Sequence, residues 1–261
     1  MRYHSLLSCM TLSMAVLAAG CKSGTPIEKL AEIPAKPAVS YFKVDPATAG
    51  TISGKISYAG RPPVRKAIDM SEDPACVGAR HEKAFDESVV VGPRSGLANV
   101  FVYIKSGLEG KTFAVPSDVV VINQGGCQFH PHIIGVQVDQ PVQITNTDPV
   151  THNIHPMAVN NREWNHSQGP GDPALNRKFI KPEIMIPVKC NIHGWMHSYI
   201  GVVDHPYFAV SKDDGTFQIT NLPPGTYTLG TWQEKLGTQE QQVIVAPGGK
   251  ATINFSYKGK A

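Results

Sequence analysis

Short runs of alternating apolar and polar residues constrain the fold of this chain more than any other feature. From Thr51 onward these runs include "TISGKISYAG", "LANVFVYIKSG", "DVVVINQ", "IIGVQVD" and "PVQITNTD", with Gly, Pro or Asp at the turns. A period of two is typical of strands with one buried face, and no long segment has helical periodicity. The 24 glycines and 21 prolines suit tight turns. We therefore expect an all-β protein, with one long polar loop over residues 160–182.

Charge and motif content argue against two broad classes of function. Charged residues make up 17% of the chain and the net charge is +3, without a long basic run or an interleaved aromatic stripe. Proteins that bind nucleic acid usually have such features to contact the phosphate backbone, so we expect no nucleic-acid partner. The chain also lacks a nucleophile elbow, a His-Glu-x-x-His zinc motif and a glycine-rich phosphate loop. We expect a protein that is not an enzyme.

The N-terminus has the pattern of an export signal. Arg2 precedes the apolar run "LLSCMTLSMAVLAAG", which is too short for a permanent membrane span. The run ends in "LAAGC", which resembles the bacterial lipobox; the alternative is a plain secretory signal with a chance cysteine. We expect residues 1–20 to be removed, Cys21 to carry lipid, and residues 21–48 to form a Pro/Ala-rich linker. The protein would then be an extracytoplasmic lipoprotein on the periplasmic face or at the outer membrane.

Export determines how the five cysteines are counted. Cys9 leaves with the signal and Cys21 carries lipid, so Cys76, Cys127 and Cys190 remain in an oxidising compartment. Three pairings are possible, and each leaves one cysteine out. That cysteine is either a free thiol or a metal ligand.

The segment "CNIHGWM" places three metal-binding side chains at steps of three residues. Cys190, His193 and Met196 supply a thiolate, an imidazole and a thioether. Two His and one Cys with a weak axial Met form a site that stabilises copper in both oxidation states. The second imidazole would come from His152, in "QITNTDPVTHNIH". The alternatives are a disulfide for Cys190 and a core position for Met196.

Four further histidines lie close in sequence to these residues. We expect them to be polar residues at strand ends, although each could replace a ligand or form a second metal site. They are His130, His132, His155 and His197.

These motifs resemble the cupredoxins. The spacing Cys-x2-His-x2-Met, followed by the strand "MHSYIGVV", is similar to the ligand loop of amicyanin. The run "FHPHIIGVQVDQPVQITNTDPVTHNI" resembles the approach to the first ligand in that family, with Asp139 where the pattern usually has Gly. The resemblance covers residues 117–203 and implies a cupredoxin-like Greek-key sandwich.

The resemblance also implies a type 1 copper cofactor. Asn153 would join the two ligand-bearing segments by a hydrogen bond. The thiolate must be free, so Cys76 would pair with Cys127. The copper ligands would be His152, Cys190, His193 and Met196.

A second resemblance concerns both ends of the exported chain. The segment "DGTFQITNLPPGTYTL" resembles the carboxypeptidase regulatory-like (transthyretin-like) β-sandwich. The first strand of that family is similar to "GTISGKISYAGRPP", about 140 residues earlier. Residues 49–116 and 204–257 would then form one small sandwich, with residues 117–203 inserted. An independent N-terminal strand pair is the alternative.

The copper module predicts a membrane-anchored one-electron carrier whose partner is a redox protein such as a cytochrome or an oxidoreductase. Gly194 and Trp195 would let that partner approach the edge of His193. Two alternatives are copper delivery or storage, and a non-catalytic structural or carbohydrate-binding sandwich.

Overall fold

The computed structural model describes residues 39–80 and 82–259, and the described residues from Ser40 onward form one compact unit. The expected signal peptide (1–20), the lipidated Cys21 and most of the linker (21–48) lie outside these residues. Within the described part, no helix is long and apolar enough to cross a membrane.

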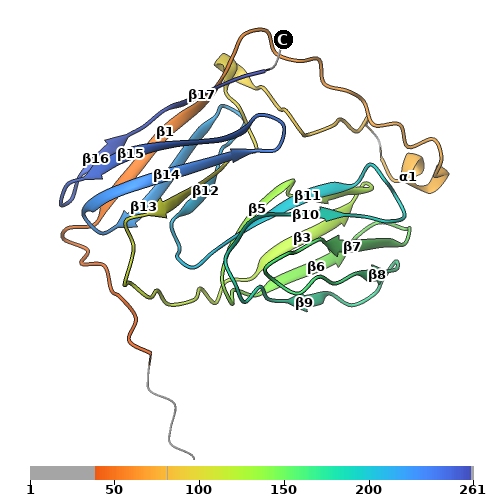
Figure 1. Cartoon of the computed structure of the whole chain (residues 1–261). Helices are drawn as coiled ribbons and strands as arrows, with labels where there is room; N and C mark the ends of the chain where they lie inside the picture. The colour runs from red at the N-terminus through yellow and green to blue at the C-terminus, as the bar shows by residue number, and fades with distance from the viewer. Residues whose placement is uncertain (1–38, 81, 260–261) are drawn as a thin grey trace, which may run out of the picture. The chain divides into compact units, whose positions relative to one another are not determined.

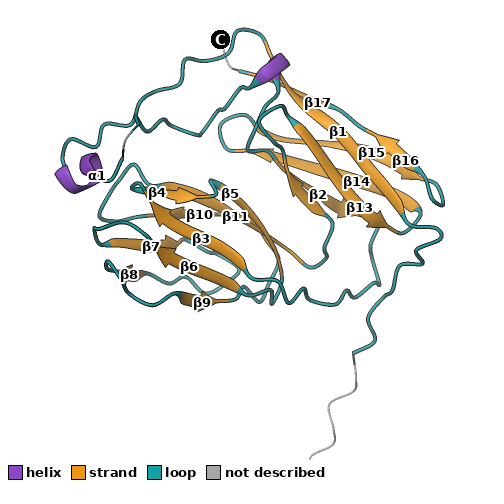
Figure 2. Cartoon of the chain, turned by 180° about the vertical axis from the view of Figure 1, so that it is seen from behind, coloured by secondary structure: helices purple, strands orange, loops and turns teal. Residues whose placement is uncertain are grey.

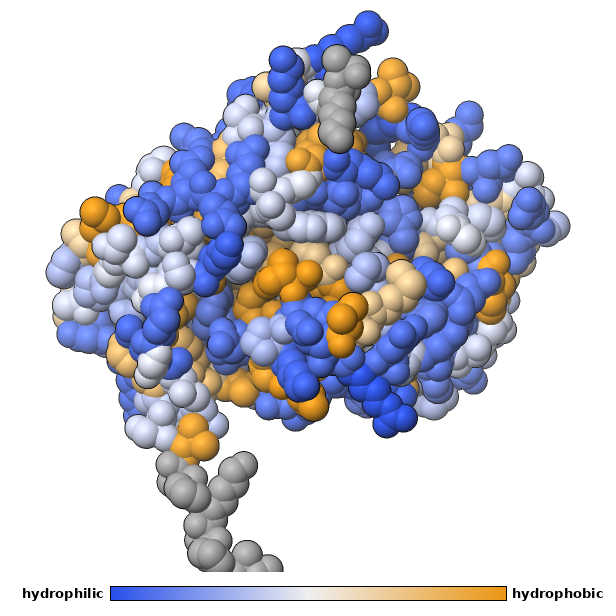
Figure 3. Space-filling model, viewed as in Figure 1, coloured by the Kyte–Doolittle hydropathy of each residue, from blue (hydrophilic) through white to orange (hydrophobic). Residues whose placement is uncertain are grey.

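The expected all-β fold is confirmed. The described residues contain 17 strands, the short α-helix α1 (Pro74–Gly78) and the 3-10 helix η1 (Pro93–Ser95), and the strands form four sheets (Figure 2). The face seen in Figure 3 is mainly hydrophilic, and its hydrophobic residues occur in small groups. This is expected when the apolar faces of the strands are turned inward.

Two of the sheets form the sandwich that we call the outer sandwich. Its first sheet has β1 next to three partners: β13 (Thr216–Leu222), β16 (Lys250–Thr252) and β17 (Phe255–Lys258), with β1 at Gly50–Ala59. Its second sheet has the order β12 (Phe208–Val210), β2 (Phe101–Ser106), β14 (Gly225–Gln233) and β15 (Gly237–Val245).

The other two sheets form the inserted sandwich. The five-stranded sheet has the order β5 (Ile133–Gln137), β11 (His197–Val203), β10 (Glu183–Lys189), β7 (His152–Pro156) and β8 (His166–Gln168). The four-stranded sheet has the order β4 (Gln128–His130), β3 (Val120–Gly125), β6 (Val142–Asn146) and β9 (Leu175–Arg177).

Strand pairing shows that one sandwich is nested within the other along the chain. β1 pairs with β13, β16 and β17, and β2 pairs with β12 and β14, although the partners follow more than 100 residues later. In Figure 1 the orange β1 accordingly lies among blue strands, while green and cyan strands form the other sandwich. Each sandwich has its own core, and a smaller cluster that includes Phe101, Ile133 and Val203 joins the two.

Residues 67–86 depart from the expected division of the chain. They were expected to belong with the outer sandwich, as part of residues 49–116. In the structure Met70, Cys76 and Ala84 instead pack into the core of the inserted sandwich, and Cys76 is bonded to Cys127. Burial of these side chains and the disulfide together hold the segment there.

The expected long loop at residues 160–182 was wrong in part, because it contains the short strands β8 and β9. β8 pairs with β7, and β9 pairs with β6. The amide of buried Gln168 donates to the carbonyl oxygens of Ile144 and Pro173 at 3.3 and 3.0 Å. Polar residues therefore serve here as partners for buried backbone.

Candidate metal centre

Strand pairing brings the two ligand-bearing segments together. His152 is the first residue of β7, and Cys190 directly follows β10. β7 and β10 are antiparallel neighbours, with Lys189 opposite His155. β10 then turns into β11 through the loop that carries His193, so the loop lies beside the start of β7.

Three donor atoms converge in this place. His152 Nδ1 lies 2.9 Å from His193 Nδ1, and Cys190 Sγ lies 3.9 Å from the same His193 atom. All three donors lie within 4.8 Å of one another. A metal ion about 2.0 Å from nitrogen and 2.3 Å from sulfur holds such atoms roughly 3 to 4 Å apart. The exposed fraction is 0% for His152, 2% for Cys190 and 3% for His193, so the position is shielded from water.

The environment of Cys190 favours the thiolate, which is the form that binds metal. Its Sγ accepts hydrogen bonds from the backbone N–H groups of His193 at 3.3 Å and Asn153 at 3.5 Å. Burial raises the pKa of the thiol, but the hydrogen bonds from His152 and from the backbone lower that pKa to about 6. Cys190 is free, in contrast to Cys76 and Cys127. A soft thiolate with two imidazoles is a donor set suited to copper.

Asp148 orients the first histidine. His152 Nε2 lies 2.8 Å from Asp148 Oδ2, and the same carboxylate accepts the backbone N–H groups of Gly126 and Cys127. Burial alone would lower the pKa of His152, but the hydrogen bond to Asp148, followed by the bond to Cys190, raises it to about 9. The carboxylate holds a proton on Nε2 and leaves Nδ1 facing the other donors. Asp148 was not among the predicted site residues, although it stands only four residues before His152.

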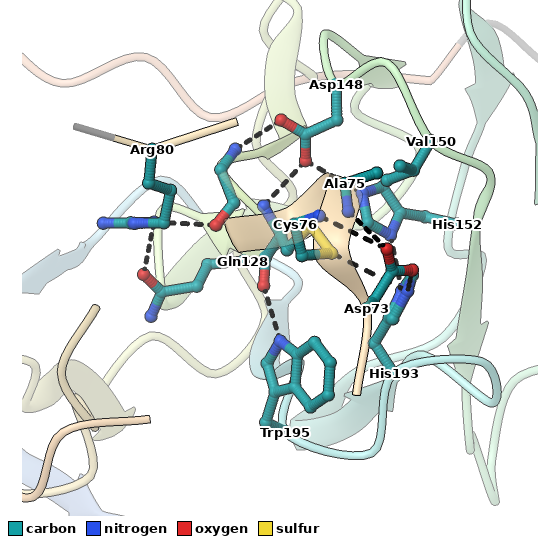
Figure 4. The surroundings of a disulfide bond; sticks show 12 residues. Asp73, Ala75, Cys76, Arg80, Gln128, Asp148, Val150, His152, His193 and Trp195 are labelled. Carbon is teal, nitrogen blue, oxygen red and sulfur yellow. Dashed lines mark hydrogen bonds and ion pairs between the residues drawn. A yellow bond between two sulfur atoms is a disulfide. The ribbon is translucent and has the colours of Figure 1, made fainter. Parts of the chain in front are cut away.

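The outer edge of His193 is covered by residues of the segment 67–86. His193 Nε2 lies 2.9 Å from Asp73 Oδ2 and 3.7 Å from Cys76 Sγ, and Figure 4 shows Asp73 and His193 meeting beside the disulfide. Asp73 also caps α1 by accepting the N–H groups of Ala75 and Cys76. The hydrogen bond from His193 lowers the pKa of Asp73. The imidazole edge itself is therefore not open, in contrast to the expectation from Gly194 and Trp195. Asp73 precedes His193 by 120 residues, which left no local signal of the contact.

Trp195 and Gly194 lie next to the covered histidine. The Trp195 ring centroid is 5.1 Å from that of His193, and its indole N–H donates to the carbonyl of Cys127 at 3.0 Å. Trp195 is half-buried and Gly194 is exposed. These two residues are the part of the loop that reaches the surface.

Asn153 makes hydrogen bonds between the two segments that carry the donors. Its Oδ1 accepts the backbone N–H of Asn191 at 2.5 Å, and its Nδ2 donates to Asn165. These bonds fix the position of the loop relative to β7.

Met196 is buried in the same core as Cys190. Its backbone closes the loop: the carbonyl accepts the N–H of Cys190 at 3.1 Å, and its own N–H donates to the His193 carbonyl at 3.0 Å. The role of Met196 as axial ligand stays a prediction.

The neighbouring histidines have partners elsewhere. His155 Nε2 meets Glu163 near the surface, and His130 Nε2 lies 3.1 Å from the carbonyl of Gly125. His132 and His197 lie beside Glu234.

Comparison with known proteins gives partial likenesses. No curated protein matches the chain. Residues 192–253, less than half of the chain, match the family described as "Polysaccharide lyase family 4, domain II".

Three solved structures show partial likenesses to this chain. An oxidised mutant of amicyanin is 19% identical, with a TM-score of 0.30, over 39% of this chain and 97% of that one. A purple cupredoxin from Nitrosopumilus maritimus is 21% identical, with a TM-score of 0.28, over 32% and 98%. A copper-containing nitrite reductase from Thermus scotoductus SA-01 is 19% identical, with a TM-score of 0.31, over 38% of this chain and 26% of that one. This chain thus spans about a quarter of the nitrite reductase, and no likeness of the three covers more than 39% of this chain.

Proposed function

We propose that this protein binds one copper ion through His152, Cys190 and His193 and acts as a one-electron carrier. The observation that carries the proposal is the convergence of two Nδ1 atoms and one thiolate in a buried position. Met196 would be the axial ligand of a type 1 site. Copper held in such a site cycles between its two oxidation states.

The surroundings of the donors suit electron exchange better than catalysis. Asp148 holds His152, Asn153 holds the loop, and two backbone N–H groups hold the thiolate. Such support keeps the donors in one arrangement and so reduces the reorganisation that accompanies a change of oxidation state. The three donor side chains are almost fully buried, so a substrate in solution has little access to them.

The redox partner would dock at Gly194 and Trp195. Asp73 covers the imidazole edge of His193, so the partner would contact the exposed Gly194 and the half-buried Trp195 instead of that edge. An acylated Cys21 and the linker to residue 48 would hold the module near the membrane surface, where a membrane-associated cytochrome or oxidoreductase is reached by short diffusion.

The test is the visible absorption and copper paramagnetic resonance spectrum of the protein after addition of one equivalent of copper(II). We expect an intense thiolate-to-copper band in the wild type and its loss in Cys190→Ser. His155→Gln is the matched control, because His155 lies nearby but is bonded to Glu163, and its band should be unchanged. A colourless wild-type protein would contradict the electron-carrier proposal and leave copper delivery or storage, or a structural or carbohydrate-binding sandwich.

Copper delivery or storage is the second candidate, and the covered edge of His193 favours it. A stored ion needs enclosure more than it needs a docking edge. Transfer to a copper(I) chelator within minutes would support this function, whereas retention over hours with rapid reduction by a small electron donor would support the carrier.

A further inference from the structure

A second group of metal-binding side chains lies outside the copper position. It consists of His132, just before β5; His197, the first residue of β11; and Glu234, just after β14. The two histidines belong to the inserted sandwich and the glutamate to the outer sandwich. We call these three residues the His132 cluster.

The donor atoms of the His132 cluster face one another. His132 Nε2 lies 2.5 Å from Glu234 Oε2, and His197 Nε2 lies 3.8 Å from Glu234 Oε1. The two imidazole rings are 5.1 Å apart and edge to face. The side chains of His132 and Glu234 are 3% and 1% exposed, whereas His197 is 31% exposed.

Two metal-binding atoms of the cluster, His197 Nε2 and Glu234 Oε1, are buried and make no hydrogen bond, although Lys235 Nζ forms an ion pair with Glu234 Oε1 at 3.3 Å. The other nitrogen of His197, Nδ1, lies 3.1 Å from the carbonyl of Trp195, which can only accept, so Nδ1 carries a proton. His197 Nε2 therefore faces a carboxylate oxygen 3.8 Å away. Such a pair is satisfied either by a second proton on the ring or by a metal ion between the two atoms.

We propose that His132, His197 and Glu234 bind a divalent transition-metal ion, with Zn²⁺ as the best fit. Two imidazoles and one carboxylate are ligands that Zn²⁺ takes at about 2.0 to 2.2 Å, which places the ligand atoms roughly 3 to 3.5 Å apart. His132 would move away from Glu234 by less than about 1 Å, and His197 would move closer by a few tenths of an ångström.

Open space lies beside the two histidines. An open surface pocket of about 260 Å³ reaches His197 and Lys235, and a small cavity of about 10 Å³ is lined by both histidines, whereas Glu234 lines neither space. The small cavity is roughly the size of one water molecule. Lys235 Nζ lies 3.3 Å from Glu234 Oε1 and would compete with the metal.

The site would join the two sandwiches at the loop that carries the copper ligands. His197 directly follows Met196, and Glu234 lies in the hairpin between β14 and β15. A bound ion would therefore hold the end of the ligand loop against the outer sandwich.

The experiment is a titration of the full chain with cobalt(II), followed by visible absorption and by competition with zinc. All variants carry Cys190→Ser, so the result does not depend on whether the copper proposal holds. Glu234→Gln preserves the shape of the side chain, and His197→Ala removes a partly exposed one. Each should weaken binding of one metal equivalent by at least about 100-fold, more than the loss of a residue that only supports a ligand.

His130→Ala is the matched control, because His130 is exposed and lies two residues from His132, and it should bind as the parent does. Lys235→Ala should tighten cobalt binding, since it removes the competing ammonium group. Zinc should also raise the melting temperature of the parent but not that of Glu234→Gln. If Glu234→Gln and His197→Ala bind cobalt as tightly as the His130→Ala control, the cluster is an ion pair between the sandwiches and the proposal is wrong.

Discussion

Removal of the Cys76–Cys127 disulfide should cost the protein a large part of its stability. The two cysteines are 51 residues apart in the sequence. In the chain-entropy description, opening a loop of that length gives the unfolded state about 14 cal/mol/K more entropy, or about 4 kcal/mol at 25 °C. A domain of this size has a free energy of unfolding of about 5 to 15 kcal/mol, so the double variant Cys76→Ala, Cys127→Ala should lose between about a quarter and four fifths of it.

The assay is urea unfolding of the metal-free protein, followed by tryptophan fluorescence. Cys190→Ser is the control, because it removes a buried sulfur and leaves the disulfide intact. A second readout is the reaction of His193 with diethyl pyrocarbonate, detected by peptide mass spectrometry. Cys76 Sγ lies 3.7 Å from His193 Nε2, so release of the segment 67–86 should expose this nitrogen and raise the rate of modification.

A loss of less than about 1 kcal/mol, well below the chain-entropy value, would refute the reasoning. Burial of Met70 and Ala84 would then be sufficient to hold the segment. An unchanged rate of His193 modification would show that Asp73 covers the imidazole without help from the disulfide.

Two further predictions concern stability. The carboxylate of Glu183 accepts the backbone N–H groups of residues 159–161; burial raises its pKa, but these hydrogen bonds outweigh burial and hold the pKa below the usual value of a glutamate. The stability that Glu183 contributes is therefore present above about pH 4.5 and is lost as the pH falls. Glu183→Gln should lower the free energy of unfolding, measured in urea, by about 1.5 kcal/mol at pH 7 and by less at pH 3.5. Equal losses at the two pH values would contradict this. At Gly201, a Cβ would lie 2.6 Å from the buried ring of Phe101. Gly201→Ala should therefore lower the free energy of unfolding by about 1 to 3 kcal/mol and lower the melting temperature. Gly194→Ala is the control, because a Cβ there meets no atom within 4 Å, and it should change the melting temperature little. Equal melting temperatures of the two variants would show that the Phe101 ring can move aside.

The features that the sequence predicted correctly are those encoded locally. Period-two alternation indicated the strands, and the Cys-x2-His-x2-Met spacing drew attention to the loop whose Cys190 and His193 meet His152. Strand pairing then brings His152 next to that loop, because β7 and β10 are neighbours.

The features that the sequence did not predict depend on distant residues. Asp73 reaches His193 across 120 residues, and Glu234 reaches His132 across 102. Acidic residues in turn-rich segments have many possible partners, and only the assembled sheets select one. The strands β8 and β9 were missed for a related reason: they are three residues long and polar, so their pairing is decided by β7 and β6 rather than by their own alternation.

The nested topology links the two proposed metal positions. The ligand loop enters from β10 and leaves through β11, and elements outside residues 117–203 contact it in two places: Asp73 and Cys76 at His193, and Glu234 at His197. An excised module of residues 117–203 would retain His152, Cys190, His193 and Met196 but would lose both contacts. The donor set is thus local to the inserted sandwich, whereas the enclosure of His193 and the restraint on His197 come from segments that precede and follow it in the chain. Insertion within the outer sandwich brings both segments to one loop, because the chain passes the inserted sandwich before entering it and again after leaving it.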